Sequence, residues 1–600
     1  MPSAPAVVML SGRKFVLGCL LLACLVLAAG RAVSFPVSLL AAEVFATILG
    51  LFLLGSFTYQ LHKNALTYGM LLVIVATFCG LPTSEWHTQI AGGGWSTWLR
   101  EHLLSFRGLD NLIHADTMLF ILGLTFFVSV IAQTRMLEGI TFFVLRRNGG
   151  AILPTVVSVT AVVAFASGIL DGVSMIGLTI RTLVIILMLA AAPRSAILFA
   201  VMICTTVTTV CGVWLAYGEP PNLIMKANLH PYLGGTFFLR YCGPIAIATY
   251  LVVVRHLRAA LAGQRIDLDK MDVLDANAED VRFLQATRHG EVLTPVELIE
   301  GHAPYLAEKA QRVVERLRAG TALGTALVME KVPLEIRQEL LGHYVSEELA
   351  DSLDRHYVLD QEGDDEGAMR AEQWVDDTLA ASAQLRRRAQ MIGGLALIPF
   401  VIMLIIHGMN NEVPLFLASF AGFAVAITGI ARIPRMRALA LREAWHEYAE
   451  YYFLFPLFLA ITLLTVAGFF DRIETLIHYG LQTLGHYPVA WSQFMGSTIL
   501  SAILDNNIVA DFASRGLRNL DLSTLHLFAM AQIAGYALGG CWTHIGCAQS
   551  VVAYAFIQRD VDEHYTPVQW IRQMTPVIVE MLIVITVLIY LESKLLTWLS

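Results

Sequence analysis

Two carboxylates lie within otherwise apolar stretches of this chain, and they are the first residues that could do chemistry. Asp171 lies in the segment 164–174 and Asp505 in the segment 501–508. A carboxylate at the middle of a bilayer costs at least ~2.5–3.5 kcal/mol, so it is kept there for a cation, a proton or a partner. We therefore expect Asp171 and Asp505 to hold an ion. The alternative is that both only cap helices that end at an interface.

The neighbours of both carboxylates suit a hard cation such as Na⁺. Hard cations need several oxygen ligands, which carboxylates, amides and carbonyls freed at a helix break can supply. Gly168 and Gly172 flank the first carboxylate, as expected of a chain that turns back within the membrane. The candidate binding residues of these two segments are Ser167, Asp171, Ser501, Asp505, Asn506 and Asn507, with Na⁺ expected at Asp505 and Asn506.

A second pair of segments carries residues that break helices. Gly218, Pro220 and Pro221 interrupt the first segment and Gly546 the second, which frees backbone carbonyls and amides. His544 would titrate near neutral pH and could sense it, although a histidine in this setting is commonly just hydrogen-bonded. The candidate binding residues here are Glu219, Asn222, Thr543, His544, Gln549 and Ser550.

Both kinds of segment recur along the chain in the same order. Ser167–Asp171 reads S-G-I-L-D and Ser501–Asp505 reads S-A-I-L-D. Further on, Gly212–Gly218 and Gly540–Gly546 share their first Gly, the Trp and the last Gly. Two matches in the same order at nearly the same offset indicate an internal repeat. Each half would then contribute one Asp-bearing break and one Gly-bearing break.

Membrane helices must position these segments. The chain has 600 residues, of which 56% are hydrophobic and 15% charged, with a mean hydropathy of +0.64. A soluble chain would carry roughly 25% charged residues. A bilayer-spanning helix needs ~20 apolar residues. The stretches expected to cross are 15–34, 36–58, 65–82, 117–133, 152–170, 172–192, 196–217, 241–255, 391–407, 414–431, 451–469, 488–504, 526–545 and 575–596.

Basic residues set the expected orientation, because cytoplasmic loops are enriched in Lys and Arg. The clusters expected on the cytoplasmic side are Lys63, Arg135 with Arg146 and Arg147, Arg255 with Arg258, Arg386–Arg388, and Arg432 with Arg435, Arg437 and Arg442. The amino terminus is then inside and the carboxyl terminus outside. The amphipathic segment after 117–133 falls inside and its counterpart, 470–486, falls outside. The two halves are therefore expected to have inverted topology, which is typical of secondary transporters.

The sequence divides into four parts. Residues 1–35 are expected to be a membrane helix, with a signal-like segment as the alternative. Residues 36–255 and 391–600 are the two transmembrane repeats. Residues 256–390 are rich in charge, with amphipathic stretches such as Tyr305–Leu317, and are expected to be a helical cytoplasmic insertion. A regulatory or partner-binding role for this insertion is the alternative.

At these residues the chain resembles the ion transporter superfamily, which includes NhaD-type sodium/proton antiporters, arsenite permeases and citrate or dicarboxylate transporters. Asp505-Asn506 is similar to the hairpin motif of the antiporter branch. Gly218–Ile224 is similar to the family break G-T-P-P-N-L-I, with Glu219 in place of Thr. The resemblance implies re-entrant hairpins, broken helices, a homodimer and elevator-type alternating access.

The resemblance implies a Na⁺/H⁺ antiporter, a multi-pass protein of the bacterial inner membrane in which Asp505 and Asp171 alternately hold Na⁺ or H⁺. No cofactor is expected, with Na⁺ and H⁺ as the transported ions. No nucleic acid partner is expected, because the sequence has no basic stripe. The alternative within the family is a citrate, dicarboxylate or arsenite permease, whose anion would meet the half-helix amino termini at Asn222 and Gln549. A membrane enzyme or sensor is a third reading, but neither H-E-x-x-H nor a serine-nucleophile motif is found, so no enzymatic activity is expected.

Overall fold

The computed structural model consists almost entirely of helices. Apart from the antiparallel two-residue strands β1 (Thr287–Arg288) and β2 (Glu291–Val292), every named element among the described residues is a helix. The structure describes residues 12–32, 67–69, 71–73, 75, 91–134, 136–170, 172–189, 192–265, 287–288, 291–292, 307–318, 329–331, 365–410, 412–449, 451–466, 468–562 and 564–599. The expected span 36–58 lies outside these residues, as does Asp171.

Five helical segments of the described chain are long and apolar enough to cross a membrane. They belong to α7 (Ala115–Gln133), to α13 (Gly235–Phe237) with η2 (Phe238–Cys242) and α14 (Gly243–Leu261), to α22 (Asp365–Met409), to α24 (Pro434–Ala449) with α25 (Leu454–Val466), and to α31 (Pro567–Leu599). Helices suit a bilayer because their backbone groups bond internally. The chain is therefore an all-α membrane protein, as its composition predicts.

Two groups of four helices carry the predicted breaks. The first group is α9 (Ile152–Ser167), α10 (Gly172–Leu189), α11 (Arg194–Thr208) and α12 (Pro220–Asn228), and the second is α27 (His486–Ile503), α28 (Asn506–Arg515), α29 (Leu522–Trp542) and α30 (Ala548–Phe556). In each group the chain leaves the helix once at the Asp-bearing segment and once at the Gly-bearing segment. These interruptions explain why α12, α28 and α30 are shorter than a membrane is thick.

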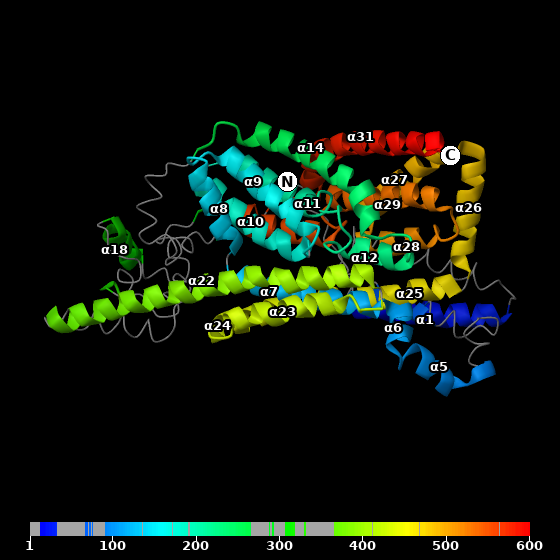
Figure 1. Ribbon diagram of the computed structural model, residues 1–600, viewed down its shortest axis with the longest axis horizontal. Coiled ribbons are helices and arrows are strands. Elements are labelled where there is room, and N and C mark those ends of the chain that lie inside the picture. Colours follow the sequence, from blue (N-terminus) through cyan, green and yellow to red (C-terminus); the bar gives the residue numbers. More distant parts are fainter. Residues whose placement is uncertain are drawn as a thin grey trace.

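α7, α22 and α23 (Phe416–Ile430) pack side by side along one edge of the molecule (Figure 1). A Cβ placed on Gly123 of α7 would lie 2.4 Å from the Ser419 hydroxyl of α23, so the glycine allows a close approach. α24 packs on α7 as well, where the Ser129 hydroxyl donates to the Ala440 carbonyl over 3.0 Å. These four helices form one layer beside the broken helices.

Short helices occupy opposite ends of the molecule. In Figure 1, α8 (Met136–Arg147) and α18 (Ala307–Arg318) lie at the left end, whereas α26 (Phe469–Leu484) runs across the right end. α5 (Trp95–His102) and α6 (Phe106–Ile113) lie towards the same end as α26 and lead into α7. α1 (Gly12–Ala32) corresponds to the first expected apolar stretch.

The central insertion is described only in part. α18 corresponds to the expected amphipathic stretch, and its buried Val313 is flanked by Arg312 and Arg316, which pair with Glu330 over 2.8 and 2.6 Å. α22 begins at Asp365, well before the expected boundary at residue 391. The second half is thus entered through one continuous helix, which also runs through Gly393, Gly394 and Pro399.

Candidate functional site

The two breaks of the first group contact each other through their backbones. Gly168 follows α9 and accepts a hydrogen bond from Gly218 N–H over 3.1 Å, while Gly172 N–H donates to the Gly218 carbonyl over 3.0 Å. A Cβ on Gly218 would lie only 1.6 Å from the carbonyl oxygen of Ser167. Only glycine fits at such an approach. Gly218 is therefore required by the contact between the breaks.

The second group repeats this contact. Asn506 N–H donates to the Gly546 carbonyl over 3.0 Å, and a Cβ on Gly546 would lie 2.5 Å from the carbonyl oxygen of Ser501. Thr543 adds a hydroxyl bond to the Ala502 carbonyl over 2.6 Å. The predicted residues of the Asp-bearing and Gly-bearing segments are thus brought together in this half.

The two contacts correspond position by position. Gly172 and Asn506 each begin the helix that follows an Asp-bearing segment, and each N–H donates to the last glycine of the Gly-bearing segment. Ser167 and Ser501 each meet that glycine with the backbone carbonyl. The sequence matches therefore coincide with matching backbone contacts.

Asp505 is the N-cap residue of α28. Its Oδ1 accepts from Asn507 N–H over 3.0 Å and from the Asn507 amide nitrogen over 2.7 Å, and the residue is 8% exposed. The partial positive charge of a helix amino terminus stabilises such a buried carboxylate. The capping expected in the alternative reading of the sequence is therefore present at Asp505.

The amides beside Asp505 are also buried. Asn506 and Asn507 are each 2% exposed, and Asn507 Oδ1 has no hydrogen-bond partner among the described residues. A buried acceptor without a donor is costly, so it calls for a ligand that the protein itself does not provide. A cation next to Asp505 would satisfy it.

Glu219 connects the two halves. It is 2% exposed, precedes the first residue of α12, and accepts a hydrogen bond from Gln549 Nε2 over 2.8 Å. A Cβ on Gly172 would lie 2.2 Å from Glu219 Oε1 and 2.8 Å from Gln549 Nε2, so both side chains reach the amino terminus of α10. Lys226, on α12, lies over the Tyr217 ring, 4.8 Å from its centre.

The remaining predicted polar residues mainly brace the breaks. Asn222 accepts from the Tyr536 hydroxyl over 2.6 Å and donates to the Leu215 carbonyl over 3.2 Å. The Ser167, Ser501 and Ser550 hydroxyls bond the carbonyls of Ala164, Tyr536 and Gly540, respectively. These hydrogen bonds stabilise the backbone where the helices are interrupted, so the role that they show for these residues is structural.

His544 packs against an aromatic ring. Its centre lies 4.6 Å from that of Tyr554, and its Nδ1 is buried without a hydrogen-bond partner in the part of the chain that the structure describes. The expected hydrogen bond is therefore not observed at Nδ1. Among the predicted residues that the structure describes, His544 is the one for which ring packing, and not a hydrogen bond to a break, is observed.

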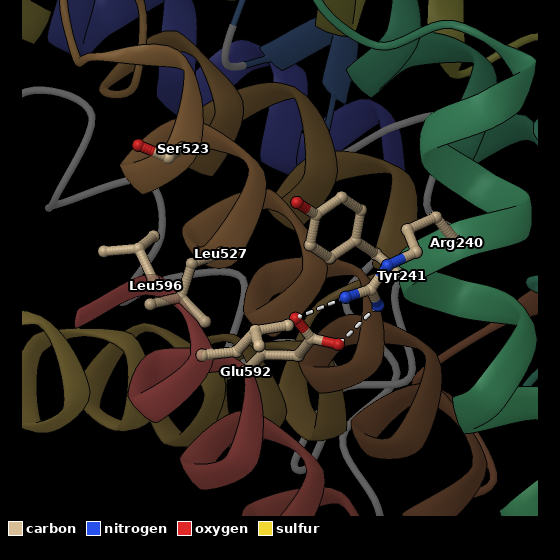
Figure 2. Close-up of a pocket in the computed structure, with 7 residues that line it drawn as sticks. Arg240, Tyr241, Ser523, Leu527, Glu592 and Leu596 are labelled. Atoms are coloured by element: carbon tan, nitrogen blue, oxygen red, sulfur yellow. Dashed lines mark hydrogen bonds and ion pairs between the residues drawn. The ribbon is translucent and has the colours of Figure 1, made fainter. Parts of the chain in front are cut away.

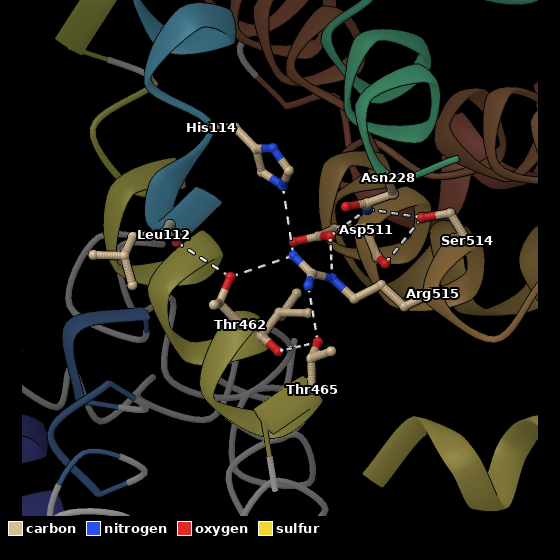
Figure 3. Close-up of polar contacts among 9 residues, drawn as sticks. Leu112, His114, Asn228, Thr462, Thr465, Asp511, Ser514 and Arg515 are labelled. Carbon is tan, nitrogen blue, oxygen red and sulfur yellow. Dashed lines mark hydrogen bonds and ion pairs between the residues drawn. The ribbon is translucent and has the colours of Figure 1, made fainter. Parts of the chain in front are cut away.

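A buried polar network at the far end of α28 extends beyond the sequence prediction (Figure 3). Arg515 donates to Asp511 Oδ1 over 2.8 Å and to the Thr465 hydroxyl over 2.8 Å, and Asn228 donates to the same Asp511 oxygen over 2.6 Å. Their spacing of four residues on a helix was a sign that Asp511 and Arg515 could pair. Nothing in the sequence pointed to Asn228 or Thr465, which come from α12 and α25.

Two cavities lie outside the breaks. One, of about 480 Å³, is lined by Arg240 and Glu592, which form a two-pronged ion pair, together with Tyr241 and Ser523 (Figure 2). The other, of about 420 Å³, lies where α6 and α7 meet α12 and α28. Among the described residues no group of three or more His, Cys, Asp or Glu could hold a metal ion. A cation bound at the breaks would therefore need amide and backbone oxygens as ligands in addition to a carboxylate.

Comparison with models of protein families gives no match, and comparison with curated proteins gives none either. The resemblance to the ion transporter superfamily therefore rests on the sequence motifs alone.

Proposed function

We propose that this protein is a secondary active transporter that exchanges Na⁺ for H⁺ by alternating access. The observation that carries the proposal is Asp505, a buried carboxylate at the amino terminus of a half-helix, beside the unpartnered oxygen of Asn507. A buried carboxyl group in this position can bind a cation in its charged form or carry a proton in its neutral form. Competition between the two at one site is sufficient for exchange.

The matching backbone contacts support two related halves. The hydrogen bonds from Gly172 to Gly218 and from Asn506 to Gly546 have the same length and join equivalent repeat positions. α8 and α26 occupy corresponding places in the two halves yet lie at opposite ends of the molecule, which supports inverted topology (Figure 1). Inverted repeats with discontinuous helices form the ion sites of many transporters.

Glu219 and Gln549 would couple the two halves. Their hydrogen bond places a second carboxylate where the breaks of the two groups meet. Asp171 directly precedes α10 in the sequence, so we include it as the third ionisable group of the site. We further propose that the layer of α7, α22, α23 and α24 is a static, dimer-forming scaffold in a bacterial inner membrane, with the broken helices as the moving part.

The test is a pair of matched aspartate variants. Asp505 and Asp521 are both N-cap residues whose side chains accept a backbone N–H, but Asp505 is buried and Asp521 is exposed. Asparagine caps helices about as well as aspartate, so Asp505→Asn removes the charge and keeps the cap. We expect Asp505→Asn to abolish proton release when Na⁺ is added to proteoliposomes, and Asp521→Asn to leave it unchanged.

Full exchange activity in the Asp505→Asn variant would mean that Asp505 is a cap only, and the proposed site would be wrong. Li⁺ and K⁺ are compared with Na⁺ in the same assay to define the ion. Uptake of labelled citrate without any proton response to a cation would favour the permease instead.

A further inference from the structure

The cavity of about 420 Å³ has a size suited to a small ligand. It is lined from both halves of the sequence, by residues of α6, α7, α12 and the end of α28. Its charged lining consists of four cationic side chains, Arg107, Lys226, Arg515 and Arg518, and two carboxylates, Asp110 and Asp116. Positive groups therefore outnumber negative ones.

Both carboxylates are already engaged by backbone donors. Asp110 Oδ1 accepts from Asp116 N–H over 2.9 Å. The two oxygens of Asp116 accept from Leu415 N–H and Phe416 N–H, over 2.8 and 3.0 Å, at the start of α23. Helix amino termini offset negative charge. These donors offset part of the carboxylate charge, and Asp116 still interacts electrostatically with Lys226.

The cations are balanced less well. Arg515 pairs with Asp511 over 2.8 Å, but Arg107, Lys226 and Arg518 form no ion pair with an acidic side chain in the described part of the chain. Lys226 lies in the last turn of α12, where the partial negative charge of the helix end stabilises its positive charge. Arg107 is in the first turn of α6, where a helix dipole disfavours a cation. An excess of positive charge therefore faces this space.

We propose that this cavity binds a compact oxyanion with at least two negative charges, of the phosphate or polycarboxylate kind. Arg107 and Arg518 are exposed, so they can attract an anion from solution and bind it through two parallel N–H donors each. Lys226 is half-buried and supplies a compact charge deeper in the cavity.

This oxyanion site is separate from the proposed ion site. Lys226 and Arg515 lie in the last turns of α12 and α28, whereas Glu219 and Asp505 occupy the N-cap positions at the opposite ends of these helices. A separation of seven positions, from Glu219 to Lys226, corresponds to roughly 10 Å along a helix. A bound oxyanion would join α6 to α12 and to the turn after α28, and it would do so whether or not the protein exchanges cations.

The test is a binding measurement on the full chain in neutral detergent. Isothermal titration with inorganic phosphate and with citrate should show saturable binding to the wild type. The double variant Arg107→Gln/Arg518→Gln should weaken it at least tenfold, and Arg107→Lys/Arg518→Lys should weaken it less, because the charges are kept. Arg240→Gln, in the other cavity, removes an arginine that is also exposed and should leave affinity within twofold (Figure 2).

A phospholipid headgroup could supply the same chemistry. The same variants are therefore titrated with short-chain phosphatidylglycerol and, as a neutral comparison, phosphatidylcholine. Binding of phosphatidylglycerol alone, lost in Arg107→Gln/Arg518→Gln, would assign the site to a headgroup phosphate. Absence of binding by every probe, or equal affinity in wild type and double variant, would overturn the proposal.

Discussion

Single glycines determine how closely the broken helices approach one another. Gly218 and Gly546 each lie against the backbone of the preceding Asp-bearing segment, and neither has a positive φ angle. Glycine is therefore needed at these two positions because a side chain would not fit, and not because the backbone conformation excludes other residues. The two positions were recognisable in the sequence as matching ends of a repeated motif, but the contacts they permit were not.

Adding one methyl group at either glycine should therefore be strongly destabilising. A Cβ on Gly218 would lie 1.6 Å from Ser167 O and one on Gly546 2.5 Å from Ser501 O, both backbone atoms that cannot rotate away. We expect Gly218→Ala and Gly546→Ala to lose at least ~1–3 kcal/mol of stability, measured by thermal unfolding in detergent. Gly218→Ala should be the worse of the two.

Gly177 and Gly496 are matched controls, because they lie in α10 and α27 and a Cβ on either would meet nothing within 4 Å. Alanine there should be neutral or stabilising by about 0.5–1 kcal/mol. Equal melting temperatures for all four variants would show that the breaks do not touch as described.

At the scale of elements, α28 is fixed at both ends by different means. Asp505 caps its start, while Asp511 and Arg515 join its last turns to α12 and α25. Asp511 and Arg515 have side chains 0% and 4% exposed, so their charges depend on each other. A buried pair contributes little net stability, but removing one partner leaves an unpaired buried charge.

This dependence predicts a non-additive pair of substitutions. Asp511→Asn leaves the Arg515 charge buried without its counter-charge and should cost about 3–5 kcal/mol. Combining it with Arg515→Met should recover most of that loss, which chemical unfolding in detergent can measure. The exposed pair of Arg240 and Glu592, with side chains 49% and 20% exposed, serves as the comparison and should cost less than ~1 kcal/mol when broken. Additive effects of Asp511→Asn and Arg515→Met would contradict the network in Figure 3.

At the scale of the whole molecule, the lengths of the apolar stretches predicted the helices better than the positions of the polar residues predicted their contacts. The apolar stretches 152–170, 414–431 and 488–504 correspond to α9, α23 and α27 within a few residues, because ~20 apolar residues define a span without knowledge of neighbours. Which oxygens meet across the breaks was not predictable, because Asn222 with Tyr536 and Glu219 with Gln549 join residues more than 300 positions apart. The start of α22 was also missed, since a polar helix before a span has no hydrophobic boundary.

The opposite orientation of the two halves leads to a labelling prediction. Arg147 ends α8 and Tyr479 lies on α26, and both residues are exposed. The helices α8 and α26 lie at opposite ends of the molecule (Figure 1). Single cysteines at these positions, with Cys24 and Cys79 replaced by alanine, are treated with a membrane-impermeant maleimide. If the amino terminus is cytoplasmic, Tyr479→Cys should be labelled in intact cells and Arg147→Cys only after the membrane is permeabilised.

Two positions on either side of α23 calibrate the experiment independently of any repeat. Glu412 and Arg432 are exposed residues just before and just after this apolar helix, so cysteines there should report opposite faces of the membrane. Tyr479→Cys should follow Glu412→Cys, and Arg147→Cys should follow Arg432→Cys. If Arg147→Cys and Tyr479→Cys label from the same face while the calibrating pair labels from opposite faces, the halves are not inverted. The two halves would then not be related by a two-fold axis in the membrane plane. Alternating access based on inverted repeats could not explain ion exchange by this protein.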